Sequence, residues 1–191
     1  MNRLGLSLFI LVLSLTMMGL LMVYNTTSAE IIDKRGSADL SYAFFKQLSY
    51  AICGTLLGLL VIQVGYERLL RIAPILMVGL TILLVCTLLP FIGLQLNGAR
   101  RWIGAFGLTF QPSEFVKIIL PITFIGWLKK YSYNIDFKLF VKALLVLAVP
   151  MGLILIEPDN GTVAIIIATM VVVFFLAQIN WRYWVIPMVA V

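Results

Sequence analysis

Residues Leu4–Tyr24, "LGLSLFILVLSLTMMGLLMVY", form a continuous apolar stretch without a charged side chain close to the N-terminus. A helix of roughly 20 such residues crosses the hydrocarbon core of a bilayer, which is about 30 Å thick. The stretch exceeds the roughly 7–15 apolar residues of a signal peptide, although Thr27, Ser28 and Ala29 follow it like a cleavage site. We therefore predict a retained transmembrane helix.

Further stretches of the same character follow along the chain. Hydrophobic residues make up 62% of the sequence and charged residues only 12%, and the mean hydropathy is +1.09. A soluble domain buries its core with about half its residues apolar, so this composition indicates an integral membrane protein. We predict an all-α, polytopic membrane helix bundle. The predicted spans are Leu4–Tyr24, Phe44–Val64, Ile72–Leu94, Pro112–Leu128, Leu139–Ile156 and Thr162–Ile179.

Several classes of site are excluded by what the sequence lacks. The chain has no histidine, which excludes Ser/His/Asp and Cys/His catalytic arrangements and histidine metal sites within it. Cys53 and Cys86 lie inside apolar runs and are interpreted as small buried hydrophobic residues. No phosphate-binding loop of the G-x-x-x-x-G-K-[ST] type is present, so no coupling to ATP hydrolysis is predicted.

The distribution of Lys and Arg predicts which loops face outward. A cytoplasmic N-terminus places the larger share of these residues inside, including those of Lys129–Lys142. The outer loops are then Asn25–Ala43, Gln95–Gln111 and Glu157–Gly161. The last residues, "WRYWVIPMVAV", begin a further apolar run, so residues 1–191 are expected to be a single membrane domain that stops at the start of a seventh helix.

The segment "NGARRWIGAFGLTFQPSEFVK", from Asn97, concentrates charge between two apolar spans. Residues 97–99 are expected to form a turn. Arg100 and Arg101 form a paired cationic site, and a guanidinium fork matches phosphate oxygens at any relevant pH. Trp102 suits the membrane interface. The alternative for all three side chains is an anchoring role at the membrane boundary.

The end of this segment predicts the start of a helix. Pro112 suits a first helical turn, where the charge of Glu114 is favoured by the helix dipole. Lys117 follows Glu114 at i,i+3, so both side chains lie on one face. The pair is either a structural ion pair or part of the lining of a functional cavity, because charges near a span usually pair or face a polar cavity.

The segment "EPDNGT" lies between two apolar spans, where Pro158 and Gly161 are expected to break the helix. Asp159 or Asn160 can cap the following helix. Alternatively, Glu157 and Asp159 supply oxygen ligands of the kind Mg²⁺ accepts, or a carboxyl pair whose proton affinities are pushed apart.

In their order and spacing, "NGARRWIG", "QPSEFVK" and "EPDNGT" resemble the motifs of the shape, elongation, division and sporulation (SEDS) family, the FtsW and RodA family. The segments "YNTTSAE" and "FFKQ" are more similar to its division branch than to its elongation branch. The familiar third motif has glutamine and leucine where this chain has Glu157 and Asn160. The match covers nearly the whole chain, as the front part of a ten-helix fold.

The resemblance implies a peptidoglycan glycosyltransferase that polymerises lipid II during bacterial cell division. The alternatives are a transporter (flippase) of the lipid-linked precursor and a non-catalytic division scaffold. Implied partners are lipid II, a class B penicillin-binding transpeptidase and other division proteins, with no nucleic acid. The implied location is the bacterial cytoplasmic membrane at the septum. A divalent cation, Mg²⁺ or Mn²⁺, is the expected cofactor, without a nucleotide.

The resemblance also assigns roles to residues of this chain. The family's proposed catalytic aspartate follows the seventh helix and would lie beyond Val191, so the chain alone is expected to be inactive. The implied substrate-binding residues are Arg100, Arg101, Trp102 and Asp159, the supporting residues are Glu114 and Lys117, and the structural motif residues are Pro158 and Gly161.

Overall fold

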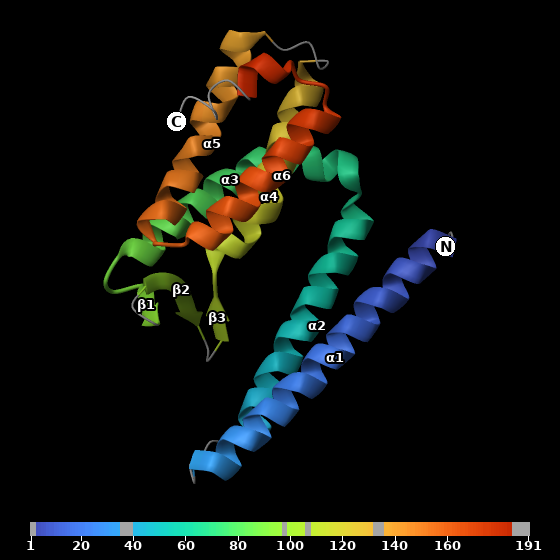
Figure 1. Ribbon diagram of the computed structural model, residues 1–191, viewed down its shortest axis with the longest axis vertical. Helices are drawn as coiled ribbons and strands as arrows, with labels where there is room; N and C mark the ends of the chain where they lie inside the picture. Colours follow the sequence, from blue (N-terminus) through green and yellow to red (C-terminus); the bar gives the residue numbers. More distant parts are fainter. Residues whose placement is uncertain (1–2, 35–39, 97–98, 106–107, 132–135, 185–191) are drawn as a thin grey trace. The chain divides into compact units, whose positions relative to one another are not determined.

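The computed structural model describes residues 3–34, 40–96, 99–105, 108–131 and 136–184 (Figure 1). It contains two compact units, Met1–Val64 and Gly65–Val191. Membrane-length helices occur in both units. That residues 1–191 form a single membrane domain stays a prediction.

The first unit is a pair of helices, α1 (Arg3–Lys34) and α2 (Leu40–Val64), which pack side by side. Tyr24 on α1 meets Phe44 on α2 edge to face, with ring centroids 6.1 Å apart. The predicted outer loop Asn25–Ala43 is wrong in extent, because α1 continues to Lys34. No proline or glycine lies between residues 25 and 34, so nothing there interrupts the helical hydrogen bonds.

The second unit packs four helices together and carries a small sheet at one end (Figure 1). The sheet lies between the end of α3 and the start of α4, and its strands follow the order β1-β2-β3. The elements are α3 (Tyr66–Leu88), β1 (Gly93–Leu96), β2 (Ala99–Ala105), β3 (Leu108–Phe110), α4 (Pro112–Lys130), α5 (Phe137–Ile156) and α6 (Asn160–Leu176).

The core of the second unit is built around one face of α4. Val116, Leu120 and Phe124 recur every four residues on this face and are almost completely buried. The Phe124 ring meets Phe140 of α5 at 6.4 Å and Phe174 of α6 at 5.2 Å between centroids. This aromatic contact joins three helices, so it fixes where α5 and α6 stand against α4.

Two contacts fix α3 against α4. A side chain on Gly126 would stand 2.8 Å from the Leu70 carbonyl oxygen, so the glycine permits a close approach of the two helices. Where α3 begins and α4 ends, Lys129 Nζ lies 2.5 and 2.6 Å from the two carboxylate oxygens of Glu67. The opposite end of α3 contacts strands β1 and β2 of the sheet.

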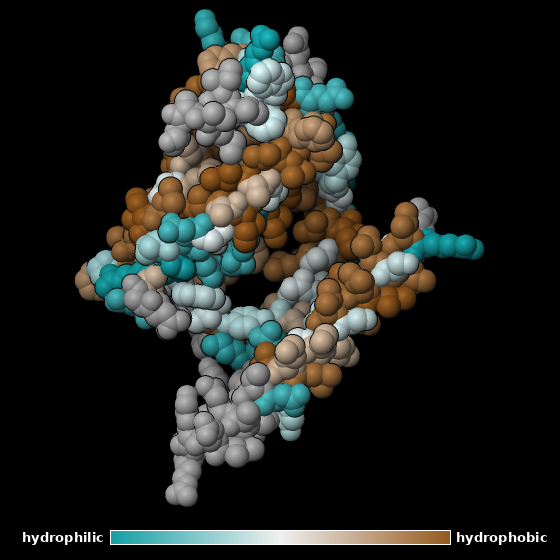
Figure 2. All heavy atoms as spheres, in the orientation of Figure 1, coloured by the Kyte–Doolittle hydropathy of each residue, from teal (hydrophilic) through white to brown (hydrophobic). Residues whose placement is uncertain are grey.

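The helical membrane fold is confirmed. The predicted span Ile72–Leu94 is wrong in its bounds, because α3 runs from Tyr66 to Leu88, ends shortly before Pro90, and is followed by β1 from Gly93. Four helices of the described residues are long and apolar enough to cross a membrane, namely α1, α2, α3 and α5. The helix α6 is apolar but has only 17 residues, and α4 carries charges at both ends. Figure 2 shows the hydrophobic surface over the helices of the second unit, with hydrophilic residues at its two ends. Residues 181–184 are helical, and the rest of the predicted seventh span lies outside the described residues.

The predicted loop Gln95–Gln111 is instead largely a sheet, which the all-α prediction missed. Backbone amides and carbonyls near a bilayer need partners, and strand pairing supplies them within the loop itself. Ile103 of β2 pairs with both Gly93 of β1 and Phe110 of β3, so β2 is the central strand. Of the turn predicted at residues 97–99, only Ala99 lies within the described residues.

Candidate functional site

A β-bulge sets the direction of Arg101. Trp102 is paired with Leu94, and Arg100 is paired with the next residue of β1, Gln95. Arg101 is therefore the extra residue of the bulge, without a partner across the β1–β2 ladder. A bulge bends the strand and re-aims the side chain it carries. Here it turns the guanidinium toward the turn that joins α5 to α6.

Arg101 clamps this turn through its whole guanidinium group. Its Nε donates to the Glu157 carbonyl oxygen at 2.8 Å, and its Nη2 donates to the Pro158 carbonyl oxygen at 2.6 Å. Its Nη1 lies 3.7 Å from Asp159 Oδ1. The side chain is 29% exposed, so most of it is committed to the protein. Arg101 ties β2 to the α5–α6 turn.

Asp159 caps α6, as one of the sequence alternatives predicted. Its Oδ1 accepts from the Thr162 amide at 3.2 Å, and its Oδ2 accepts from the Thr162 hydroxyl at 2.8 Å. Gln111, the residue before α4, also reaches Oδ2 with its side-chain amide at 3.4 Å. Asp159 is buried, and its two oxygens are engaged with the start of α6, with Gln111 and with Arg101.

The carboxyl groups of this turn are in contact with protein partners. No group of three or more His, Cys, Asp or Glu side chains that could hold a metal ion occurs among the described residues. The Asp159 oxygens already serve the cap, and a guanidinium beside them disfavours a second cation. The divalent cation expected from the resemblance stays a prediction.

Glu157 is a buried carboxyl group in an asymmetric environment. The residue is 1% exposed, and its Oε1 is in hydrogen-bond contact with the Thr87 hydroxyl of α3. Its Oε2 is buried and has no hydrogen-bond partner in the described part of the chain. Burial raises the pKa of the Glu157 carboxyl, and the negative charge of Asp159 adds to this effect, while Thr87 and Arg101 oppose it.

Arg100 is placed differently from Arg101. It lines a cavity of about 300 Å³ formed between the end of α3, the β1–β2 hairpin and the end of α5. No hydrogen bond or ion pair of its guanidinium is found among the described residues. Trp102 is half-buried on the same strand. The other residues that line the cavity are Leu88, Gln95, Ala99, Ile156, Glu157 and Pro158.

Glu114 and Lys117 form the ion pair that their spacing predicts. Lys117 Nζ lies 2.7 Å from Glu114 Oε1, and the side chains are 21% and 50% exposed, respectively. Pro112 begins α4 and Glu114 occupies its first turn, as expected from the sequence. In the described structure, no hydrogen bond or ion pair connects this pair to Arg101. Their functional roles stay predictions.

The motif residues Pro158 and Gly161 have different places. Pro158 lies between α5 and α6, and its carbonyl oxygen accepts from Arg101. The expectation that Gly161 breaks the helix is wrong, because Gly161 is the second residue of α6. A single glycine is tolerated inside a helix, and α6 begins before Gly161 because Asp159 caps its N-terminus.

Two residues of the site were not predicted from the sequence. Thr87 and Gln111 both hold carboxyl groups of the α5–α6 turn, over separations of 70 and 48 residues. Hydroxyl and amide side chains are common at helix ends, so neither carried a distinctive signal. The unusual carboxyl at Glu157 was the available clue, since a buried acid requires a polar partner.

The chain matches the family model described as cell cycle protein, FtsW/RodA/SpoVE, over residues 6–191. It is 34% identical to a probable peptidoglycan glycosyltransferase FtsW of Trichlorobacter lovleyi, covering 89% of this chain and 45% of that protein. The crystal structure of Thermus thermophilus rod shape determining protein RodA matches with 27% identity and a TM-score of 0.65, covering 90% of this chain and 57% of that one. A structure described as a peptidoglycan synthase complex that coordinates polymerization and crosslinking matches with 28% identity and a TM-score of 0.64, covering 90% and 51%.

Proposed function

Because the chain belongs to the FtsW/RodA/SpoVE family, we propose that the protein of which it forms part polymerises lipid II into peptidoglycan glycan strands during cell division. The chain spans about half the length of the curated relatives it matches. The names of those relatives support glycosyl transfer, and several of the relatives are named FtsW. The undecaprenyl diphosphate of the substrate would be the leaving group, so no nucleotide is needed.

The observation that carries this proposal is the contrast between the two arginines. Arg101 is held by the α5–α6 turn, whereas Arg100 lines a cavity of about 300 Å³ with its guanidinium unpaired within the described structure. A guanidinium is matched to phosphate oxygens, and it stays charged throughout the physiological pH range. We therefore propose Arg100 as the residue that binds the lipid diphosphate. Arg101 and Asp159 would shape the cavity wall, and Trp102 would contact the substrate beside it.

The ion pair of Glu114 and Lys117 has a supporting role in this proposal. Glu114 is half exposed at the start of α4, so its carboxylate can interact with groups outside the described residues. We place it near the catalytic carboxylate that the resemblance assigns to a later part of the family's fold. In that position Lys117 would keep Glu114 oriented and would lower the local negative charge.

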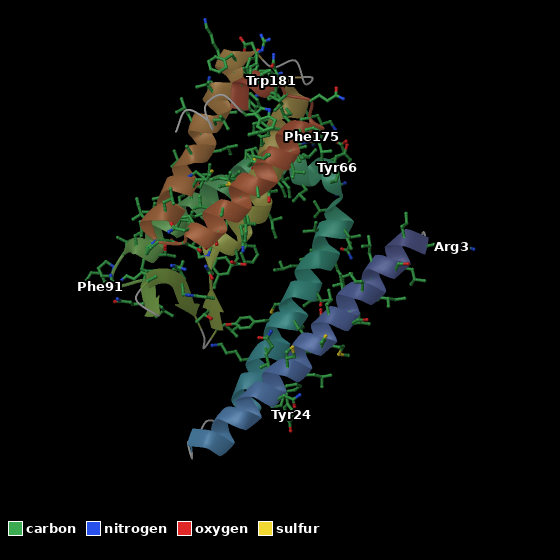
Figure 3. All side chains as sticks on the ribbon, in the orientation of Figure 1. Arg3, Tyr24, Tyr66, Phe91, Phe175 and Trp181 are labelled. Carbon is green, nitrogen blue, oxygen red and sulfur yellow. The ribbon has the colours of Figure 1, made fainter. Side chains whose placement is uncertain are left out.

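The proposal includes a partner and an orientation. The similarity to a structure described as a peptidoglycan synthase complex supports a penicillin-binding transpeptidase as the partner. The septum is the location that we propose for both proteins. The outer side of the cytoplasmic membrane would carry the sheet, and the N-terminus would be cytoplasmic. Figure 3 shows Phe91 at the sheet end of the second unit and Trp181 near the opposite end.

Cysteine labelling tests this orientation. Phe91 is 98% exposed, and Lys130 is exposed at the far end of α4. In a protein that lacks Cys53 and Cys86, Phe91→Cys should react with a membrane-impermeant thiol reagent in intact spheroplasts, and Lys130→Cys should react only after lysis. The opposite pattern would reverse the orientation.

The activity is tested with purified full-length protein in detergent and labelled lipid II. Glycan strands should form without a nucleotide, and Arg100→Gln should slow their formation. Detergent micelles have no compartments, so polymer cannot arise from transport across a membrane. Flipping of lipid II in vesicles without polymer formation would favour the transporter. The absence of both activities would favour a scaffold.

A further inference from the structure

We propose that Glu157 is a positioning residue that works as a neutral carboxylic acid, which donates a hydrogen bond to Thr87 and thereby fixes the turn that Arg101 clamps. The link to catalysis rests on the proposed function, whereas the protonation state can be tested without it.

The Thr87 hydroxyl has two oxygen neighbours and only one hydrogen. It lies 2.6 Å from the Leu84 carbonyl oxygen and is also in hydrogen-bond contact with Glu157 Oε1. A carbonyl oxygen can only accept, and a hydroxyl donates once. If Thr87 donates to Leu84, the hydrogen between Thr87 and Glu157 must come from the glutamic acid. A neutral Glu157 satisfies both contacts, whereas an ionised Glu157 leaves one pair of oxygens without a hydrogen.

The surroundings of Glu157 favour the same protonation state. The residue is 1% exposed, and its Oε2 has no hydrogen-bond partner among the described residues. An ionised carboxylate carries charge on both oxygens. A buried oxygen without a hydrogen-bond donor therefore has a much larger desolvation penalty in the ionised form than in the neutral acid. The protonated form leaves only one neutral carbonyl oxygen without a donor.

The charged groups that face Glu157 come from two directions. Asp159 belongs to the same turn and favours the neutral acid, while Arg101 of β2 favours the carboxylate. Arg101, however, directs its Nε and Nη2 at backbone carbonyl oxygens and its Nη1 at Asp159. From α3 the group in contact is the uncharged Thr87. The charge of Arg101 is therefore already largely committed to other partners, while Arg100 lines the same cavity as Glu157 without a hydrogen bond or ion pair to it among the described residues.

Glu157 links α3 to the candidate site, so its protonation state affects the geometry of that site. Glu157 supplies the carbonyl oxygen that accepts from Arg101 Nε, and its side chain is bonded to α3. The residue also lines the cavity that contains Arg100. Loss of the proton would place a charge between α3 and the turn, and would weaken the contact that holds the Arg101 clamp in place.

Infrared spectroscopy tests the protonation state directly. The difference spectrum between the wild-type protein and Glu157→Gln, both in lipid nanodiscs, should contain the carbonyl band of one protonated carboxylic acid at neutral pH. The band should persist at a pH where an exposed glutamate is ionised, and Thr87→Val should shift it, while Thr87→Ser should not. A carboxylate band in its place, at a pH one unit above the ordinary glutamate range, would overturn the proposal.

The pH dependence of stability provides a second readout. Because burial raises the folded-state pKa, the protonated acid stabilises the fold below the pKa of the unfolded chain, and this contribution is lost as pH rises through the folded-state pKa. The melting temperature of the wild type should therefore fall with rising pH relative to Glu157→Gln, whose neutral amide can also donate to Thr87. Parallel profiles would contradict a neutral Glu157. If Glu157→Gln does not fold, the Thr87→Val and Thr87→Ser spectra still decide.

Lipid II polymerisation separates this inference from the proposed function. The wild-type rate should decline at alkaline pH, and Glu157→Gln should retain activity there. A wild-type protein without polymerase activity refutes the proposed function and leaves the infrared result intact. An active Glu157→Gln protein with the wild-type pH profile refutes the positioning role alone.

Discussion

Removing the Arg101 side chain should destabilise the fold through the loss of its clamp on the α5–α6 turn. Its hydrogen bonds to the carbonyl oxygens of Glu157 and Pro158 are 2.8 and 2.6 Å long. A hydrogen bond that involves a charged group contributes roughly 1.5–3 kcal/mol. The side chain is 29% exposed, so water can replace part of each bond. We expect Arg101→Ala to lower the free energy of unfolding by about 2–4 kcal/mol.

Two further variants separate the clamp from general charge effects. Arg101→Lys should recover about half of the loss, because an ammonium group cannot donate to both carbonyl oxygens in the geometry of the guanidinium fork. Arg100→Ala removes the same charge from the neighbouring position and should change stability by less than about 0.5 kcal/mol. The assay is equilibrium unfolding in mixed micelles, followed by tryptophan fluorescence. Equal losses for Arg101→Ala and Arg100→Ala would refute the clamp.

Three further changes test other contacts of the second unit. Gly93→Ala should lower the free energy of unfolding by about 1–3 kcal/mol in the same assay, because its Cβ would clash with the Thr87 carbonyl oxygen. A loss no larger than that of Gly152→Ala, which has open space around its Cβ, would refute this close approach. Asp159→Ala should lower the free energy of unfolding by roughly 0.5–2 kcal/mol, and Asp159→Asn should lower it much less, because asparagine also caps helices. Equal losses for the two variants would show that the cap contributes little to stability. A double-mutant cycle of Glu114→Gln and Lys117→Met should give a coupling free energy of about 0.2–1 kcal/mol, because Glu114 is half exposed. The double mutant should nevertheless be inactive in lipid II polymerisation, and wild-type activity would remove the pair from the site.

The helices could be predicted from the sequence because hydropathy and length decide them. The end of α5 at Ile156 and the start of α4 at Pro112 were predicted to the residue. The extension of α1 to Lys34 was missed, since the prediction followed the apolar stretch and ended where polar residues begin. The β1–β2–β3 sheet was missed because its strands are short and its sequence was interpreted by its charges.

The local parts of the site were predictable and the distant ones were not. The ion pair of Glu114 and Lys117 and the cap formed by Asp159 follow from spacings of three residues. The different environments of Arg100 and Arg101 depend on a bulge in the β1–β2 ladder, which leaves no sequence pattern. The contact between Thr87 and Glu157 joins residues 70 positions apart, so it required the folded chain.

Binding of labelled lipid II to the full-length protein tests the central claim most directly, because Arg100 is assigned to the substrate diphosphate and Arg101 to the turn. Arg100→Gln should weaken binding about tenfold or more, which corresponds to about 1.4 kcal/mol or more, at unchanged thermal stability. The loss should shrink at high salt, as expected for a partly solvated charge pair. Wild-type affinity in a stably folded Arg100→Gln protein would contradict the account.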